Sequence, residues 1–202
     1  MATGRGAALW IVAAVGYLAL EAVAAAGFVP AYSYARNYIS DLGVNAISPR
    51  SCLMHAAFYL QGILFFLGGV LIAGVPESPR ARVFLGLLGA NSIGNIVIGT
   101  VHSGNVHRAG AALAIVGGNT AILAGSAVIA TVAGWPRYRL ISTALATVGL
   151  LSLLMLLINS GTSKACLLPD GVWERGSVYS ITAWQLLTAG YLLSVRRRTP
   201  AA

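Results

Sequence analysis

The chain has 202 residues, of which 57% are hydrophobic and 9% are charged, and its formal net charge is +8. A soluble domain carries about 25% charged residues, so this chain has too few charges to cover a water-facing surface. The composition excludes an ordinary soluble enzyme, a disordered chain and a disulfide-dense secreted module. Because the basic residues lie between apolar segments and not on one face, we expect no nucleic-acid partner. We predict an integral membrane protein.

Six apolar segments reach or nearly reach the length of about 20 residues that a helix needs to cross a bilayer. The segments are Ala7–Val29, Cys52–Val75, Val83–Val101, Ala109–Val132, Leu140–Asn159 and Val178–Val195. The residues between them are too few for a separate soluble domain, and the alternating strands of a membrane barrel are absent from the sequence. The predicted fold class is therefore all-α, a six-helix membrane bundle formed by residues 1–202 as a single domain.

The distribution of Lys and Arg predicts the orientation of this bundle, because positive residues are retained on the cytoplasmic side. A cytoplasmic N-terminus places eight of the thirteen Lys and Arg residues inside, including the run Arg196–Arg198 directly after the last segment. Both termini are therefore predicted to be cytoplasmic. The preference for Arg, Ala and Gly is typical of a GC-rich bacterial genome, so we expect a bacterial plasma membrane.

Five of the six segments each place one polar side chain in a thin layer slightly to the outer side of the midplane. These residues are Glu21, Gln61, Asn95, Asn119 and Gln185. They either form hydrogen bonds between helices that fix the bundle, or they form the floor of a polar pocket that opens outward. A third hypothesis is a small proton-coupled transporter that uses Glu21.

The residues best suited to chemistry lie near the outer side, and among them are all three histidines, His55, His102 and His107. Together with Asp41 and Glu174, the latter two histidines could supply the acid and base of a membrane-embedded enzyme that acts on a lipophilic substrate. Their spacing is not that of a helical zinc site, so we predict no cofactor and do not favour zinc. The alternative is that these side chains cap helices or remain solvated.

A non-enzymatic role in lipid binding is the function that we favour. Arg108 and Arg175 are predicted at the outer side, where guanidinium groups bind phosphate well. We expect a lipid or isoprenoid-type amphiphile, or another lipophilic small molecule, in the outward-facing polar pocket. A second copy of the chain or another membrane protein are further candidate partners.

Two cysteines are predicted at the outer surface, where disulfides persist. A bridge between Cys52 and Cys166 would join the first outer loop to the last. Two separate thiols buried as small hydrophobic residues are the alternative.

Small residues recur at four-residue spacing on two neighbouring segments. Gly110, Ala114 and Gly118 lie on one segment, and Ala90 and Gly94 lie on the other. This pattern predicts close packing of the two helices.

Three sequence motifs carry a resemblance to a known family. They are Asn37–Gly43 (Asn-Tyr-Ile-Ser-Asp-Leu-Gly), the pair Gly99–His102 with His107–Ala111, and Gly171–Arg175 (Gly-Val-Trp-Glu-Arg). Over essentially its whole length the chain resembles the bacterial membrane family called domain of unknown function 998. This resemblance implies no established activity.

The Ile-Ser-Asp-Leu-Gly segment, followed by Pro49 and Phe58, is also similar to the damage-regulated autophagy modulator family. That similarity implies a six-helix membrane protein with a loose link to lipid organisation. The motifs coincide with the outer residues identified above, which adds Asn37 and Ser40 to the candidate site.

Overall fold

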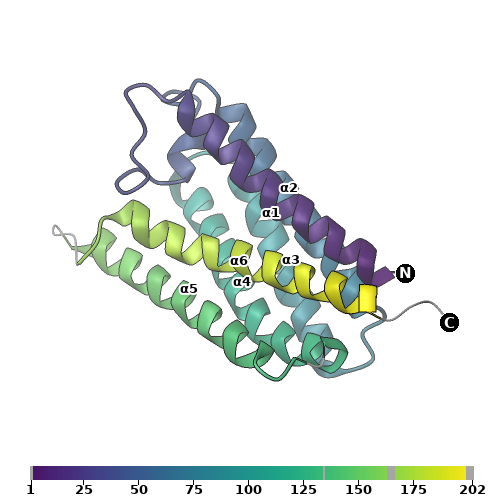
Figure 1. Cartoon of the computed structure of the whole chain (residues 1–202). Helices are drawn as coiled ribbons and strands as arrows, with labels where there is room; N and C mark the ends of the chain where they lie inside the picture. The colour runs from purple at the N-terminus through teal and green to yellow at the C-terminus, as the bar shows by residue number, and fades with distance from the viewer. Residues whose placement is uncertain (1, 134, 163–166, 199–202) are drawn as a thin grey trace.

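Six long α-helices and one short 3₁₀ helix form the structure, a computed structural model that describes residues 2–133, 135–162 and 167–198 (Figure 1). The described side chains do not include those of 131–133 and 196–198. The elements are α1 (Ala2–Ala26), η1 (Ser40–Gly43), α2 (Ser51–Ala73), α3 (Pro79–Thr100), α4 (Gly104–Ala133), α5 (Tyr138–Gly161) and α6 (Asp170–Arg198). Those three ranges contain no strand, so the predicted all-α fold is confirmed.

Helices α1 to α5 are long and apolar enough to cross a membrane. Helix α6 is not in this group by composition, because it carries several polar side chains among its apolar ones. Six of these are buried: Arg175, Ser177, Ser180, Thr182, Gln185 and Thr188. Helix α6 packs against α1, α4 and α5, so the bundle shields these groups from lipid. The chain is therefore a multi-pass helical membrane protein whose sixth helix is the most polar.

Successive helices run in opposite directions, so the bundle has two distinct ends. The end that carries the long connection 27–50 and the first turn of α6 is called the loop end here. Figure 1 shows the start of α1 and the last described turns of α6 together at the opposite end, called the terminal end.

Local sequence explains how α3 begins and how it turns into α4. The Ser78 hydroxyl accepts a hydrogen bond from the Ala81 N–H at 3.2 Å, and Pro79 occupies the first helical position, which is a favourable helix start. Only residues 101–103 separate α3 from α4. Gly104 has a φ of 81°, a left-handed value that glycine adopts at little cost. The turn is therefore shorter than the 102–108 gap between the predicted segments.

The core differs between the two ends. Toward the terminal end it is aromatic, and Trp184 packs against Trp10, Phe65 and Phe84 with ring centroids 5.1–6.4 Å apart. Toward the loop end a smaller cluster that includes Tyr17, Leu42 and Phe58 packs beneath η1. Polar groups lie between and around these clusters, and they form the candidate site.

Small residues do bring α3 and α4 together. A Cβ atom on Gly94 would lie 2.4 Å from the Ala114 backbone nitrogen, and one on Gly110 would lie 2.6 Å from a methyl carbon of Val97. This confirms the predicted close packing for these positions. Gly118 lies against both α3 and α6, since a Cβ there would lie 2.8 Å from Asn91 Nδ2 and 2.4 Å from the Ile181 side chain.

Candidate functional site

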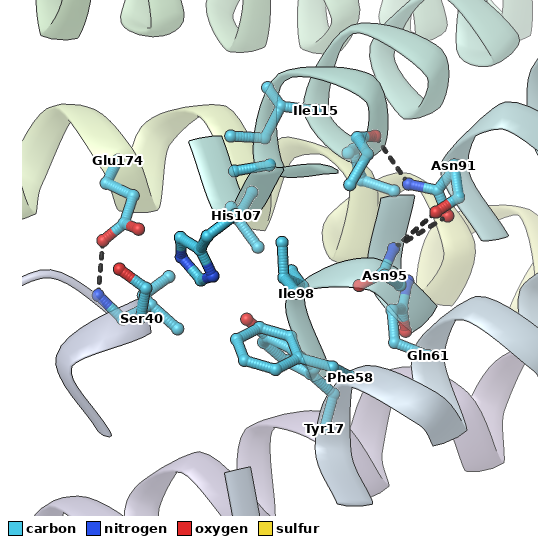
Figure 2. Close-up of a pocket in the computed structure, with 15 residues that line it drawn as sticks. Tyr17, Ser40, Phe58, Gln61, Asn91, Asn95, Ile98, His107, Ile115 and Glu174 are labelled. Atoms are coloured by element: carbon cyan, nitrogen blue, oxygen red, sulfur yellow. Dashed lines mark hydrogen bonds between the residues drawn. The ribbon is translucent and has the colours of Figure 1, made fainter. Parts of the chain in front are cut away.

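A cavity lies between five helices and η1 in the loop half of the bundle (Figure 2). Its volume is about 40 Å³, which is room for about three water molecules. Its lining residues are Tyr17, Ile39, Ser40, Phe58, Gln61, Asn91, Asn95, Ile98, His107, Ala111, Ala114, Ile115, Glu174, Val178 and Ile181. The walls are therefore mostly apolar, and the polar groups gather at two ends, as Figure 2 shows.

The polar group nearer the loop end comes from three elements distant in sequence. Ser40 of η1, His107 of α4 and Glu174 of α6 lie side by side in Figure 2. Glu174 Oε2 accepts a short hydrogen bond from the Ile39 N–H, which joins α6 to the residue before η1. All three residues are only half-buried, whereas the amides at the other end are buried. The cavity therefore reaches the surface at the loop end.

The imidazole of His107 has a defined tautomer. Its Nδ1 lies 2.6 Å from the Val101 carbonyl oxygen, and because a carbonyl only accepts, Nδ1 carries the hydrogen. In a neutral ring the other nitrogen, Nε2, then carries a lone pair. His107 thus supports the end of α3 and also lines the cavity.

The deep end of the cavity is formed by three side-chain amides. Asn91 Nδ2 donates to the Ala114 carbonyl at 2.7 Å, and Asn95 Nδ2 donates to the Asn91 carbonyl at 2.9 Å. Gln61 Nε2 donates to Gln185 Oε1 at 2.7 Å. Gln61 is 5% exposed, yet its Oε1 has no hydrogen-bond partner in the described part of the chain. This leaves a buried acceptor beside the cavity.

Arg175 of α6 is the centre of a polar network beside the cavity. Its Nη1 donates to the carbonyl oxygens of Tyr34, Asn37 and Gly171 at 2.7, 2.9 and 3.1 Å. Its Nη2 donates to Glu21 Oε1 at 3.2 Å and makes a short contact with the Tyr32 hydroxyl. The guanidinium therefore fixes the connection 27–50 on α6.

Glu21 is 1% exposed and belongs to this network. Its carboxylate accepts a hydrogen bond from Arg175, and both of its oxygens also accept from the Tyr179 hydroxyl at 2.9 Å. Glu21 does not line the described cavity. Both Nη atoms of Arg175 bond protein acceptors, and its predicted role in binding phosphate stays a prediction.

Tyrosines of the connection 27–50 cover the network. The Tyr38 hydroxyl donates to Asp170 Oδ2 at 2.5 Å, and burial together with this bond raises the pKa of Tyr38 to about 12. Burial also raises the pKa of Tyr32, although Arg175 beside it acts in the opposite direction. Tyr32 and Tyr34 both stack on the Arg175 guanidinium, at 5.3 and 4.8 Å from their ring centroids.

Other predicted site residues have local structural contacts. Asp41 Oδ2 accepts from the Tyr38 N–H at 2.9 Å, and Asn37 Oδ1 accepts from the Ser33 N–H at 2.9 Å. Asn119 bonds the Ser177 carbonyl and the Ser180 hydroxyl, at 2.9 and 2.8 Å. These contacts fit the alternative in which polar residues hold the bundle together.

The remaining two histidines form a pair of their own. The rings of His55 and His102 stack in parallel, with centroids 3.9 Å apart. His55 Nε2 donates to the Gly43 carbonyl at 2.7 Å, while His102 Nε2 lies 3.3 Å from the Gly99 carbonyl. Neither lines the cavity. Of the four residues predicted as an acid–base set, the cavity therefore brings together only His107 and Glu174.

Three further expectations concern a metal, a phosphate-binding arginine and a disulfide. Among the described residues no group of three His, Cys, Asp or Glu side chains is placed to hold a metal ion. Arg108 is exposed on the first turn of α4, next to His107. Cys52 is exposed at the start of α2, and Cys166 lies outside the described residues, so the disulfide stays a prediction.

Several participants in the network were not predicted from the sequence, among them Tyr179, Asp170 and the tyrosines of the connection 27–50. Tyr179 follows Arg175 by four residues on α6, and this spacing, which places them on one helix face, could have identified it. Asp170 is held by Tyr38 and by Asn159 Nδ2 at 2.9 Å. No local pattern indicates the contact between Tyr38 and Asp170, because 132 residues separate them along the chain.

The model of a family described as "Protein of unknown function (DUF998)" matches residues 11–191. The chain belongs to this family, as its motifs indicated. No curated protein and no solved structure matches the chain.

Proposed function

We propose that this membrane protein binds a lipid or isoprenoid-type amphiphile, with a polar group of the ligand held in the cavity at the loop end. The observation that carries the proposal is the cavity itself: apolar walls with polar groups at both ends, within an apolar bundle. Ligand sites are usually concave and apolar, with a few polar groups that fix the orientation of the ligand.

The geometry supports binding more than a purely structural role. Asn119 has all its polar atoms bonded within the protein, as interhelical glue requires. Gln61 in the cavity does not, because its Oε1 is buried and unpartnered in the described chain. A buried polar atom without a partner costs about 1–3 kcal/mol, which a bound ligand would offset.

We infer that the loop end faces the outside of a bacterial plasma membrane. The terminal end carries the exposed residues Arg5, Arg80, Arg82, Arg137 and Arg139, and positive residues favour the cytoplasm. The ligand would then come from the outer leaflet.

The test fills the cavity and measures the lipid that remains bound. Ala111 lines the cavity, whereas its neighbour Ala112 is exposed. We expect Ala111→Leu to reduce the lipid retained after gentle purification by at least about tenfold, the effect of losing about 1.4 kcal/mol of binding. Native mass spectrometry measures the retained lipid.

Ala112→Leu is the matched control, since it adds the same side chain to the same helix outside the cavity. Equal retention of lipid by wild type and both variants would contradict binding in this cavity. A wild-type protein that retains no lipid would contradict the proposal as a whole.

A second candidate function is a membrane-embedded enzyme. One observation favours it: the Nε2 lone pair of His107 lies on a ring next to Ser40 and Glu174 at the cavity, as a general base requires. We expect turnover of membrane lipid in vesicles to be lost in Ser40→Ala and in His107→Gln. Turnover no higher than in protein-free vesicles would remove this candidate.

A further inference from the structure

The loop end of the cavity has a charge and a hydrogen-bonding pattern that specify a ligand. Resting on the proposed function, we propose that it recognises a primary ammonium group carried by a lipid headgroup of the ethanolamine type. The ammonium would bind beside Glu174, and the phosphate of the same headgroup would remain at the rim.

Most of the acidic residues lie at the loop end, together with Arg36, Arg50, Arg108 and Arg175, although the chain as a whole carries +8. Four of the five acidic residues lie at this end: Glu21, Asp41, Asp170 and Glu174. Within the described chain one ion pair is formed, between Arg175 and Glu21. Glu174 at the cavity therefore has no cation paired with it in that part of the chain. Since a carboxylate at a mostly apolar cavity is stabilised by an opposite charge, a cationic ligand is favoured.

The free atoms that Glu174 and His107 offer at the loop end are acceptors. Glu174 Oε2 bonds the Ile39 N–H, while its other oxygen has no bond within the described chain. His107 presents Nε2 as a second acceptor at this end, because its Nδ1 donates to Val101. An ammonium offers three donors and no acceptor, so it complements this set. A phosphate offers only acceptors and would be repelled by the carboxylate.

The size of the cavity decides which of several headgroups with similar hydrogen-bonding groups can fit. About 40 Å³ accommodates roughly three waters, and hence a slender aminoethyl group but not a sugar ring. A trimethylated amine has no N–H donors and is bulkier. The cavity therefore favours a primary amine over both a glycosyl and a choline headgroup.

An exposed cation follows His107 along α4. Arg108 is exposed on the first turn of α4, directly after His107. Its guanidinium can bind a phosphate while the ammonium lies inside.

The experiment compares three lipids on the full-length protein in nanodiscs. Wild type is offered phosphatidylethanolamine, phosphatidylcholine and phosphatidylglycerol in equal amounts, and native mass spectrometry measures the lipid that remains bound. We expect phosphatidylethanolamine to be preferred by at least about tenfold, since hydrogen bonds to charged groups contribute about 1.5–3 kcal/mol. Glu174→Gln should abolish this preference, because the amide still accepts from the Ile39 N–H but has no charge.

Glu77→Gln is the control, because it removes the same charge from an exposed residue at the terminal end. Equal retention of the three lipids by wild type would overturn the ammonium proposal and leave the proposed function standing. Retention of none of them would overturn the proposed function. If Glu174→Gln does not fold, which its thermal unfolding shows, the wild-type comparison of the three lipids still decides.

Discussion

The terminal half and the loop half of the bundle are held together by different forces. In the terminal half, Trp184 packs against Trp10, Phe65 and Phe84, and polar groups such as the Trp184 N–H find single partners, here the Ser142 hydroxyl at 3.0 Å. In the loop half, Arg175 and Glu21 join α1, α6 and the connection 27–50 through hydrogen bonds. Packing dominates at one end and polar contacts at the other.

This difference indicates where function and stability lie. A packed aromatic core leaves no polar group free for a ligand, whereas the loop half leaves Gln61 Oε1 and the His107 ring at a cavity. Variants at the terminal end should therefore change stability alone. Variants at the loop end should change stability and ligand retention together.

The largest effect is expected from Arg175→Met. It removes one partner of a buried ion pair and leaves Glu21 charged among apolar helices, which costs about 3–5 kcal/mol in such pairs. It also frees the connection 27–50, so lipid retention should fall. Chemical unfolding in mixed micelles measures the first effect, and native mass spectrometry measures the second.

Two further variants test whether this loss of stability comes from the ion pair between Arg175 and Glu21. Arg108→Met changes an exposed arginine at the same end and should change the free energy of unfolding by less than about 1 kcal/mol. Adding Glu21→Leu to Arg175→Met should recover part of the loss, because no buried charge then remains unpaired. A double variant as unstable as the sum of the two single variants would contradict a coupled pair.

A smaller effect is expected from Trp184→Phe in the terminal half. It removes the bond to the Ser142 hydroxyl and reduces the volume of the aromatic core, for a loss of about 2 kcal/mol. Lipid retention should not change. Thermal unfolding and native mass spectrometry on the same sample check both expectations, and reduced lipid retention would contradict the separation of the two halves.

The helices and their order could be predicted from the sequence, because apolar length alone determines what can cross a bilayer. The predicted segment 52–75, for example, corresponds to α2 at Ser51–Ala73. Glu21 is unusual in the sequence, because an ionisable side chain within a membrane span is costly. What it contacts could not be predicted, since Arg175 lies 154 residues away along the chain.

The candidate site was predicted in part. His107 and Glu174 do line one cavity, whereas His102 stacks on His55, a contact set by the relative rotation of α2 and the α3–α4 turn. Sequence spacing gives the height of a residue in the bundle but not the angle at which its helix faces its neighbours. The depth of a residue in the bundle could therefore be predicted from the sequence, but the residues that it contacts could not.

A moderate effect on stability is expected where α3 meets α4. Gly94→Ala would place a Cβ 2.4 Å from the Ala114 nitrogen, so the helices must separate, at a cost of about 1–2 kcal/mol. Gly86→Ala is the matched control on the same helix, because a Cβ there meets nothing within 4 Å. Thermal unfolding should separate the two variants, and equal midpoints would contradict the close contact.

The smallest effect concerns pH and the Tyr38–Asp170 contact at the loop end. Folding raises the pKa of Tyr38 from an ordinary value of about 10 to about 12, because the hydroxyl is partly buried and donates to a carboxylate. A raised pKa means that the contribution of Tyr38 to stability is complete below pH ~10 and is lost as the pH rises through ~12. Tyr38→Phe should therefore lower the free energy of unfolding slightly at pH 8. At about pH 12 it should lower this free energy by less, or not at all. Denaturant unfolding at both pH values measures this difference, with Tyr34→Phe, whose hydroxyl has no hydrogen-bond partner in the described chain, as the control. A Tyr38→Phe effect of the same size at both pH values would contradict the raised pKa of Tyr38, which burial and the bond to Asp170 cause.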